Sequence, residues 1–511
     1  MEEKLLDGKF YLFPSCTKIH EVIVTRQNLM YREQVITKQG VPPKPFISIL
    51  MENIIGCKIF ESKMKKDSYC CLMVNMLMKN KKGTRERKHV TFCIFQSDDK
   101  QENMTITETW ARTLSWLARD PTLNVEELQE KEDFPEQRKY FILINPKSGK
   151  GKSLELFNST IEPILKDAMI KYEAFITEYS GHVMKLAKDF DHKKYDAIII
   201  CSGDGLAYEY INGIMKRADW EDCLQTPIGM VPTGSGNALS ASINYAADEN
   251  FGIVNAMYVL LKGKSHPMDL FSCHNSKGTV YGFLSLTWGL LSDVDIESEK
   301  YRFLGPLRFL LVGVQRILSL RHYHGTFYYL PALDDENRDV GIEQDGSNTQ
   351  PVIDDVDGDS SPTAPEDIEL VPKPLDCGPK CTIPALNEEC GTENWKKIEN
   401  EFILLGLQSI SHLGSDMHSA PGVHFSDGYL DLQYVSRGTT KKRMLDLLDA
   451  FETGKHLEYD DVEQIKIKAF RLVPGDDRTG HIAVDGEEVD YEPIQGEVLP
   501  SLANAIMLMK I

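Results

Sequence analysis

The sequence has no apolar run that approaches the roughly 18 residues a membrane-spanning helix needs. Its first residues alternate charged and apolar side chains, without the hydrophobic core or small-residue cleavage site of a secretory signal. Positive charge is also scarce, because 57 Lys and Arg face 77 Asp and Glu and leave a net charge of −20. Such a balance disfavours nucleic acid as a partner. We therefore expect a cytoplasmic protein that does not bind nucleic acid.

Cysteines with Cys-x-x-Cys spacing are missing as well, although the 511 residues include 11 cysteines, of which Cys70 and Cys71 are adjacent. Cys377, Cys381 and Cys390 come nearest to a metal-binding spacing, but they lie in an acidic, polar stretch without a Cys-x-x-Cys pair. Zinc ribbons need such pairs. We interpret the cysteines as reduced thiols.

The length predicts about three domains at roughly 150 residues each. Residues 1–135 hold short alternating apolar runs and then a helical pattern, an order that suits a pleckstrin-homology-like module. Residues 331–400 lose periodicity and are rich in Asp, Glu, Pro and Gly. We expect a disordered acidic insertion there.

The remaining chain predicts an α/β domain followed by a β domain. In residues 136–265, apolar strand-like runs alternate with segments of helical period. Continuous apolar runs such as residues 197–200 fit a parallel sheet covered on both faces, which favours a doubly wound arrangement. Residues 266–511, apart from the insertion, predict a mostly antiparallel β domain with one helix near residues 442–453. Its predicted strands are residues 279–286, 323–330, 402–410, 429–435, 464–472 and 481–484.

Three of the predicted parallel strands are followed by glycine-rich loops. The loop residues are Asn145, Pro146, Lys147, Ser148, Gly149, Lys150 and Gly151; then Ser202, Gly203, Asp204 and Gly205; then Gly234, Ser235 and Gly236. Glycine lets the backbone approach a ligand, and free N–H groups at a helix start attract anions. Because the carboxyl ends of parallel strands meet at one sheet edge, we expect a nucleotide crevice there.

Single positions exclude two common nucleotide motifs. A P-loop requires Gly five residues before Gly151, where this chain has Pro146. The dinucleotide fingerprint requires a third Gly where Leu154 and Leu239 stand. The crevice is therefore expected to belong to another class of nucleotide-binding protein.

Two roles are open for Asp204. Its position between Gly203 and Gly205 makes the carboxylate accessible to a ligand. Asp at a strand-to-helix junction is also a frequent helix cap, whose loss would cost on the order of 1 kcal/mol. The two further glycine-rich loops favour a ligand site over a cap.

The motifs in series resemble the diacylglycerol-kinase-like catalytic domain, specifically its sphingosine kinase branch. The resemblance is carried by Ser-Gly-Asp-Gly-Leu at residues 202–206, by Glu209, and by Pro-Thr-Gly-Ser-Gly-Asn at residues 232–237. It extends over residues 140–330 and from residue 402 to the end. The broader family usually has Gly-Gly-Asp-Gly-Thr and Gly-Thr-Gly-Asn, so Ser202, Leu206 and Ser235 favour the sphingosine branch.

The resemblance implies an ATP- and Mg²⁺-dependent kinase acting on sphingoid bases, with Asp204 as the catalytic base. Ser202 to Gly205 would contact the substrate, and Asp295, assisted by Ser285, would hold the amine and hydroxyl of the head group. No residue is assigned as a metal ligand. Besides the first loop, the implied nucleotide contacts are Thr177, Glu178, Tyr179, Ser180, Gly181, Glu209, Gly234, Ser235, Gly236, Arg302, Arg308, Asp485, Gly486 and Glu487.

Other functions remain open on the same residues. A ceramide or diacylglycerol kinase shares the plan, but an anionic Asp295 suits a free amine better than an amide. A non-catalytic, lipid-responsive scaffold would not need the intact Gly203 and Asp204. The apolar segments 284–291 and 303–320 would line a lipid pocket or form ordinary core. We expect a sphingoid-base substrate, transient peripheral contact with the membrane in which that substrate resides, and a homodimer as a further candidate partnership. For residues 309–312, core or lipid pocket is favoured over contact with the membrane.

Overall fold

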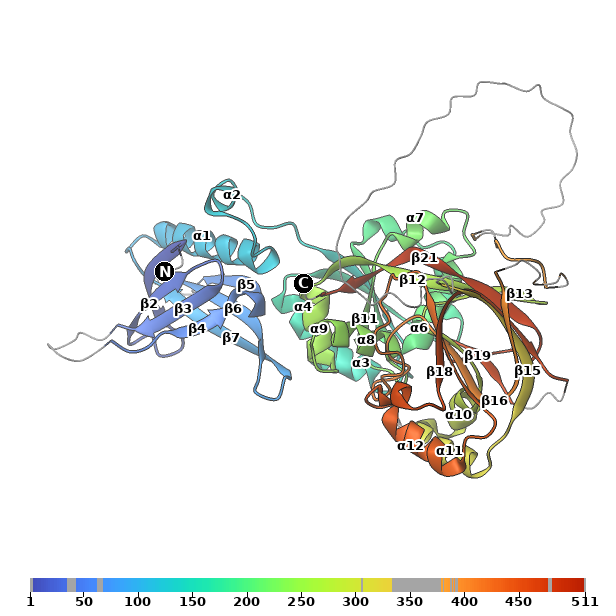
Figure 1. The fold of residues 1–511 in the computed structure, drawn as a ribbon. Helices are drawn as coiled ribbons and strands as arrows, with labels where there is room; N and C mark the ends of the chain where they lie inside the picture. Colours follow the sequence, from blue (N-terminus) through green and yellow to red (C-terminus); the bar gives the residue numbers. More distant parts are fainter. Residues whose placement is uncertain are drawn as a thin grey trace, which may run out of the picture.

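The computed structural model of the chain describes residues 3–34, 43–61, 68–304, 307–332, 394–476 and 480–509, with residues 378, 379, 381–386, 388 and 390; the side chains of residues 302 and 303 are outside this set. Figure 1 shows an N-terminal module, in blue, beside a larger body that carries both the central helices and the C-terminal strands. Among the described residues, no helix has the length and apolar character needed to cross a bilayer.

The N-terminal module is a seven-stranded antiparallel sheet covered by one helix. Its strand order is β4-β3-β2-β1-β7-β6-β5. Helix α1 (Lys100–Arg119) starts at Asp99, whose side chain accepts the N–H of Gln101 at 2.9 Å, and it buries Trp110 and Leu114 against the sheet. The strands are β1 (Leu6–Leu12), β2 (Ile19–Val24), β3 (Asn28–Glu33), β4 (Ile47–Leu50), β5 (Ile54–Glu61), β6 (Cys70–Lys79) and β7 (Arg85–Ile94).

Buried charges join this module to the rest of the chain. Arg85 of β7 donates Nη2 to Oε1 of Glu249 at 2.7 Å and Nε to Oε2 at 3.1 Å. Both side chains are 4% exposed, and the guanidinium also lies 3.2 Å from the ring centroid of Tyr258. Asn255 donates to Glu249 at 2.8 Å, so the buried carboxylate is held by several donors.

Replacing Arg85 by Met should lower the free energy of unfolding by about 3 to 5 kcal/mol, because Glu249 stays buried without its main cation. Thermal or denaturant unfolding measures the effect. Lys88→Met is the matched control, since Lys88 pairs with Glu86 on the exposed part of the same strand and should change stability little. Equal effects of the two substitutions would contradict a structural role for the buried pair.

The predicted α/β domain has four parallel strands in the order β9-β8-β10-β11. All six residues of β10 are buried, as the continuous apolar pattern predicted. The strands are β8 (Lys139–Ile144), β9 (Lys171–Ile176), β10 (Ala197–Ser202) and β11 (Ile228–Pro232). The helices that accompany them are α3 (Ser153–Leu156), α4 (Glu162–Asp167), α5 (His182–Ala187), α6 (Asp204–Ile214), α7 (Trp220–Leu224), α8 (Ala238–Ala246) and α9 (Ile253–Lys262).

An antiparallel β region follows, and it shares one sheet with the α/β part. Strand β21 (Ile494–Met507) pairs antiparallel with β12 (Lys264–Asn275) and β18 (Glu463–Pro474), and parallel with β11. The boundary predicted between residues 265 and 266 falls inside β12, while the division into domains stays a prediction. The other strands are β13 (Gly278–Gly282), β14 (Ser285–Gly289), β15 (Tyr323–Pro331), β16 (Lys396–Gln408), β17 (Leu430–Ser436), β19 (Ile482–Val484) and β20 (Glu487–Val489).

The end of the predicted insertion needs correction, because residues 396–400 belong to β16 and pair with residues 325–329 of β15. This part of β16 is largely exposed and mostly charged or polar, so its sequence lacks the clear alternation of apolar and polar residues that predicts a strand. Arg471 also donates to the carbonyls of Pro384 and Ala385, at 3.0 and 2.9 Å. Residues 333–377, where most of the predicted disorder falls, lie outside the described residues.

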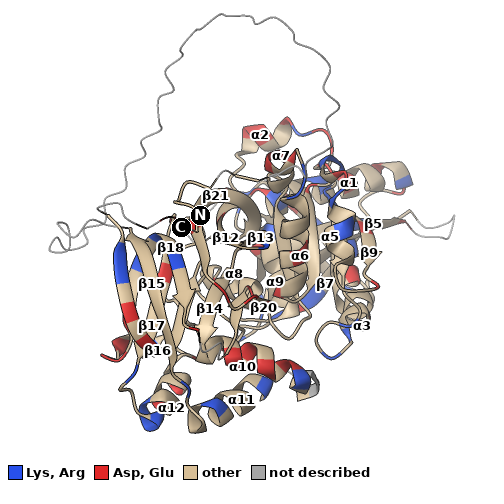
Figure 2. Ribbon diagram, turned by 90° about the vertical axis from the view of Figure 1, so that its right-hand side faces the viewer, with Lys and Arg blue, Asp and Glu red and all other residues tan. Residues whose placement is uncertain are grey.

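Three helices gather below this sheet (Figure 2): α10 (Leu290–Ser298), α11 (Leu307–Leu318) and α12 (Lys441–Ala450). The sequence pattern predicted a helix near residues 442–453 but mainly strands elsewhere after residue 266. Helices α10 and α11 are therefore additions to the predicted β domain.

Candidate active site

The three glycine-rich loops pack against one another at the carboxyl edge of the parallel sheet. A Cβ atom added at Gly203 would lie 2.4 Å from the carbonyl oxygen of Gly236, and one added at Gly234 would lie 2.4 Å from Cα of Gly203. Neither position tolerates a side chain. Gly149 has a φ of 58°, in the left-handed region that favours glycine.

Hydroxyl groups fix the first loop to the others. Ser202 donates to Oγ of Ser148 at 3.1 Å, and the hydroxyl oxygens of Ser153 and Thr233 are 2.7 Å apart. Lys147 donates its backbone N–H to the Asn145 side chain at 3.0 Å, which closes the turn before Gly149. The structure confirms the prediction that the three loops meet at one edge of the sheet.

Asp204 is the first residue of α6, but its side chain caps a different helix. Its two carboxylate oxygens accept the N–H groups of Ala238 and Leu239, at 2.6 and 3.1 Å, at the start of α8. The residue is 6% exposed, and burial raises the pKa of its carboxyl while these two N–H groups lower it. Asp204 therefore joins the second loop to the third and still faces the cavity described below.

Glu209, one turn further along α6, holds the loop after β9. Its Oε1 accepts the N–H of Gly181 at 2.9 Å. Its Oε2 is buried and has no hydrogen-bond partner among the described residues. A buried acceptor of this kind is suited to a ligand donor.

A hairpin turn brings Asp485 and Glu487 to the same place. Asp485 and Gly486, between β19 and β20, have φ values of 51° and 82°. The Asp485 carboxylate accepts three backbone N–H groups, from Phe283, Leu284 and Ser285, at 2.9 to 3.0 Å. Burial nevertheless raises its pKa to about 7.

The acidic side chains converge around the second loop and this turn. A Cβ atom at Gly205 would lie 3.1 Å from Oε1 of Glu487, and one at Gly486 would lie 3.1 Å from Oδ2 of Asp295. Burial raises the pKa of Asp295 to about 7, Arg308 opposes the shift, and Glu299, Glu487 and Asp204 add to it. The site therefore has a strong negative field.

Arg308, at the start of α11, is 4% exposed and forms an ion pair with Glu299. Its Nε is buried without a hydrogen-bond partner among the described residues. The predicted contact of Arg302 with the nucleotide stays a prediction, because the Arg302 side chain is outside the described residues.

A cavity of about 1000 Å³ joins the loops to an apolar region between α10, α11 and α12. Residues of α12 and of segment 413–417 complete it, although no sequence motif pointed to them. The predicted residues that line it are Asn145, Lys147, Ser148, Gly149, Thr177, Glu178, Tyr179, Ser180, Ser202, Gly203, Asp204, Gly205, Glu209, Ser235, Gly236, Ser285, Asp295, Arg308, Asp485, Gly486 and Glu487. Pro146, Lys150, Gly151, Gly181 and Gly234 belong to the same loops without being part of the lining.

The apolar end of the cavity comes from both predicted segments, from Val294 of α10, from Leu404 of β16, and from α12 with the following Phe451. Its side chains include Leu284, Leu290, Leu291, Val294, Leu307, Phe309, Leu310, Ile317, Leu404, Met444, Leu447, Leu448 and Phe451. A nucleotide-type loop edge and a long apolar pocket thus open into one another.

Comparison with known proteins agrees with this arrangement. The chain matches the family model described as Diacylglycerol kinase catalytic domain over residues 139–273, and the YegS C-terminal NAD kinase beta sandwich-like domain over residues 397–507. Human sphingosine kinase 1 is 37% identical over 376 residues, covering 72% of this chain and 90% of that protein. Human sphingosine kinase 2 is 27% identical over 604 aligned positions, covering 98% and 91% respectively.

The chain is also similar to a plant sequence and to a bacterial structure. Sphingosine kinase 1 of Arabidopsis thaliana is 32% identical over 355 residues, which cover 68% of each chain. A solved diacylglycerol kinase structure from Bacillus anthracis aligns with a TM-score of 0.45 at 16% identity, over 73% of this chain and 98% of that one. On the extent of its match to human sphingosine kinase 1, the chain belongs to the sphingosine kinase family, with a diacylglycerol-kinase-type catalytic domain.

Proposed function

We propose that the chain is an ATP-dependent lipid kinase that phosphorylates the primary hydroxyl of sphingosine and related sphingoid bases to give sphingosine 1-phosphate. The observation that carries this proposal is the single cavity that joins three glycine-rich loops to an apolar pocket, with acidic side chains at the junction. A phosphate donor suits the loops, and an aliphatic tail suits the pocket. The carboxylate of Asp295 between them suits a cationic amine.

Asp204 is proposed as the general base. It accepts the proton of the substrate hydroxyl as that oxygen attacks the γ-phosphorus and ADP leaves. Its bonds to Ala238 and Leu239 hold the carboxylate in place, and an ionised carboxylate has further lone pairs for the substrate. The N–H groups of the first and third loops, together with Arg308, are proposed to offset phosphate charge.

Mg²⁺ is proposed as the accompanying ion. Asp204, Asp485 and Glu487 line the same end of the cavity, and carboxylate oxygens are the donors that Mg²⁺ prefers. The ion would neutralise charge on the phosphates when bound. Asp485 also anchors the turn to Phe283, Leu284 and Ser285, so it supports Glu487 in position.

Transient membrane contact is proposed for α11, although not through all of residues 309–312. Leu310 and Leu311 are 56% and 50% exposed, whereas Val312 is buried. Leu307 and Leu318, at the two ends of α11, are 66% and 63% exposed. Leu307 and Leu310 also line the cavity, so an exposed apolar face lies beside the proposed lipid pocket. The N-terminal module is proposed to be pleckstrin-homology-like, on the basis of seven antiparallel strands followed by one helix. A homodimer stays a prediction.

The test is ATP-dependent phosphorylation of sphingosine, ceramide and diacylglycerol in detergent micelles with magnesium. Sphingosine should be the preferred acceptor. Preference for ceramide or diacylglycerol would overturn the role of Asp295 as an amine contact. Absence of turnover with all three lipids, by protein that unfolds cooperatively, would favour a non-catalytic scaffold.

A further inference from the structure

A second cluster of ligand-type side chains lies at the opposite edge of the parallel sheet. His192 begins the short turn (His192–Lys194) that leads into β10, while Asp219 and Cys223 lie at α7, which leads into β11. Because β10 and β11 are parallel, these connections meet at the amino ends of the strands. Six residues of β10 place the cluster about 20 Å from the loop that carries Asp204.

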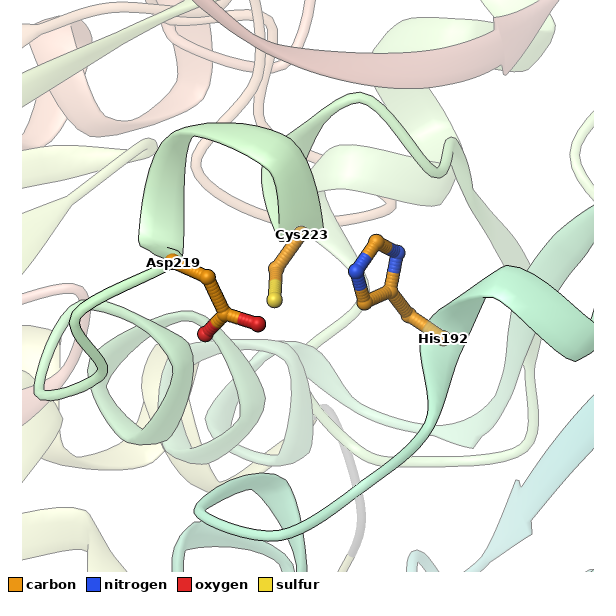
Figure 3. Close-up of side chains that lie close together, drawn as sticks. All are labelled: His192, Asp219 and Cys223. Atoms are coloured by element: carbon orange, nitrogen blue, oxygen red, sulfur yellow. The ribbon is translucent and has the colours of Figure 1, made fainter.

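The three side chains converge on one point, as Figure 3 shows. One ligand atom from each of His192, Asp219 and Cys223 lies within 4.8 Å of the others. His192 is 4% exposed and Cys223 is 1% exposed. The Nε2 atom of His192 is buried and has no hydrogen-bond partner among the described residues. A buried imidazole nitrogen without a partner is an unusual cost unless a ligand satisfies it.

Contacts around the cluster hold these side chains in the orientation that a ligand would need. Thr226 lies 3.0 Å from Nδ1 of His192, which leaves Nε2 for the centre of the cluster. Arg217 donates to both carboxylate oxygens of Asp219, at 2.7 and 2.8 Å. Arg217 is itself fixed by the carbonyl oxygens of Ala187 and Phe190, at 2.8 and 3.1 Å. Metal ligands are oriented by outer contacts of this kind, and the Asp219 oxygens retain further lone pairs.

We propose that His192, Asp219 and Cys223 bind a Zn²⁺ ion, with water in the fourth position. Imidazole nitrogen and thiolate sulfur suit Zn²⁺, whereas Mg²⁺ and Ca²⁺ prefer all-oxygen sites. The ligand atoms of a tetrahedral zinc site lie about 3.5 Å apart, so the separations in the cluster, which are within 4.8 Å, must contract by at most about 1.3 Å. Asp219 is the exposed residue that precedes α7, and the adjustment is expected at its carboxylate.

The proposed ligands supply two negative charges, from Asp219 and the Cys223 thiolate, which match a divalent cation. Asp222 also places Oδ2 at 3.8 Å from Nε2 of His192, and this carboxylate is paired with Lys193 at 2.6 Å. Cys223 is a free, buried cysteine, and only the thiolate form of cysteine binds a metal ion. Binding therefore converts the Cys223 thiol into a zinc thiolate and releases one proton to solvent. The ion would tie together the connections that precede β10 and β11.

Cobalt titration of the chelator-treated full chain tests this site, because Co²⁺ adopts zinc geometry and gives a sulfur-to-metal charge-transfer band. The wild type should bind Co²⁺ with this band and lose it when Zn²⁺ is added. Cys223→Ser should abolish the band, and Thr226→Val should weaken metal affinity by about 10- to 100-fold by freeing the His192 ring.

Cys16→Ser is the matched control, because Cys16 belongs to a separate group of thiols, 3.4 Å from Cys93 in the N-terminal module. It should retain the band. Asp219→Asn changes an exposed ligand, so it reports on the site even if the buried Cys223 variant folds poorly, and it should weaken binding. The proposal is overturned if the wild type shows no band, if Cys223→Ser keeps it, or if Cys16→Ser loses it.

Discussion

Replacement of Asp204 by Asn should lower sphingosine turnover by about 10²- to 10⁴-fold, the range that general-base catalysis contributes. Asn keeps the size of the side chain but does not accept a proton at neutral pH. It also turns an amide NH₂ toward the N–H of Ala238 or Leu239, so thermal stability should fall as well. Steady-state kinetics and thermal unfolding of the same preparation measure both effects.

Asp269 supplies the matched control for the capping role. It is buried and, like Asp204, accepts two backbone N–H groups, from Gly428 at 2.7 Å and Ser501 at 2.6 Å. It does not belong to the described lining of the cavity. Asp269→Asn should cost on the order of 1 to 3 kcal/mol in stability and leave turnover per folded molecule unchanged. If both variants lose turnover only in proportion to the unfolded fraction, Asp204 is a cap and not the base.

The positions of the glycine-rich loops were predictable from the sequence. Backbone at Gly203 and Gly234 comes too close to the neighbouring loop for a side chain, and such positions are visible as glycines after apolar strands. The contacts of Asp204 were not predictable from its neighbours in the sequence. A helix cap was one of its predicted roles, but the helix it caps begins 34 residues later and is brought there only by the fold.

Strands β12 and β21 were missed for a different reason. Pro267 and Pro500 interrupt their apolar patterns, and proline inside a run argues against a strand. The structure places Pro500 where the pairing shifts register, between Leu499 opposite Leu270 and Ala503 opposite Met268. A bulge tolerates proline, so the longest ribbon of the β region carried a misleading pattern.

The apolar pocket was only half predictable. Segments 284–291 and 303–320 were identified as pocket or core, and leucines from both line the cavity. The contribution of α12 depends on packing between helices that are more than 120 residues apart, as when Lys441 donates to the carbonyl of Leu318. The spacing of residues in the sequence gives no indication of such a long-range contact.

Asp295→Asn should lower kcat/KM for sphingosine by about 10- to 100-fold, since a hydrogen bond to a charged group contributes about 1.5 to 3 kcal/mol. The KM for ATP should change little, because the glycine-rich loops are untouched. The substitution should also raise thermal stability at pH 8. The folded-state pKa of about 7 lies above the unfolded value of roughly 3.9, so ionised Asp295 destabilises the fold as pH rises between these values.

The same pKa predicts how sphingosine recognition depends on pH. With a pKa of about 7, the ionised fraction of Asp295 rises about tenfold between pH 6 and pH 8. Equilibrium binding of sphingosine should strengthen over this range in the wild type and stay nearly flat in Asp295→Asn. Binding is the better readout than turnover, because Asp485 has a pKa near the same value and lies at the phosphate end.

An N-acylated sphingoid provides the control on the substrate side, since its amide carries no charge for Asp295 to contact. In Asp295→Asn, the difference in affinity between the amine lipid and the amide lipid should become smaller, mainly because binding of the amine lipid becomes weaker. If the variant loses affinity for both lipids equally, Asp295 positions α10 and does not recognise the amine. A pH profile that stays steep in Asp295→Asn would assign the titration to Asp485 instead.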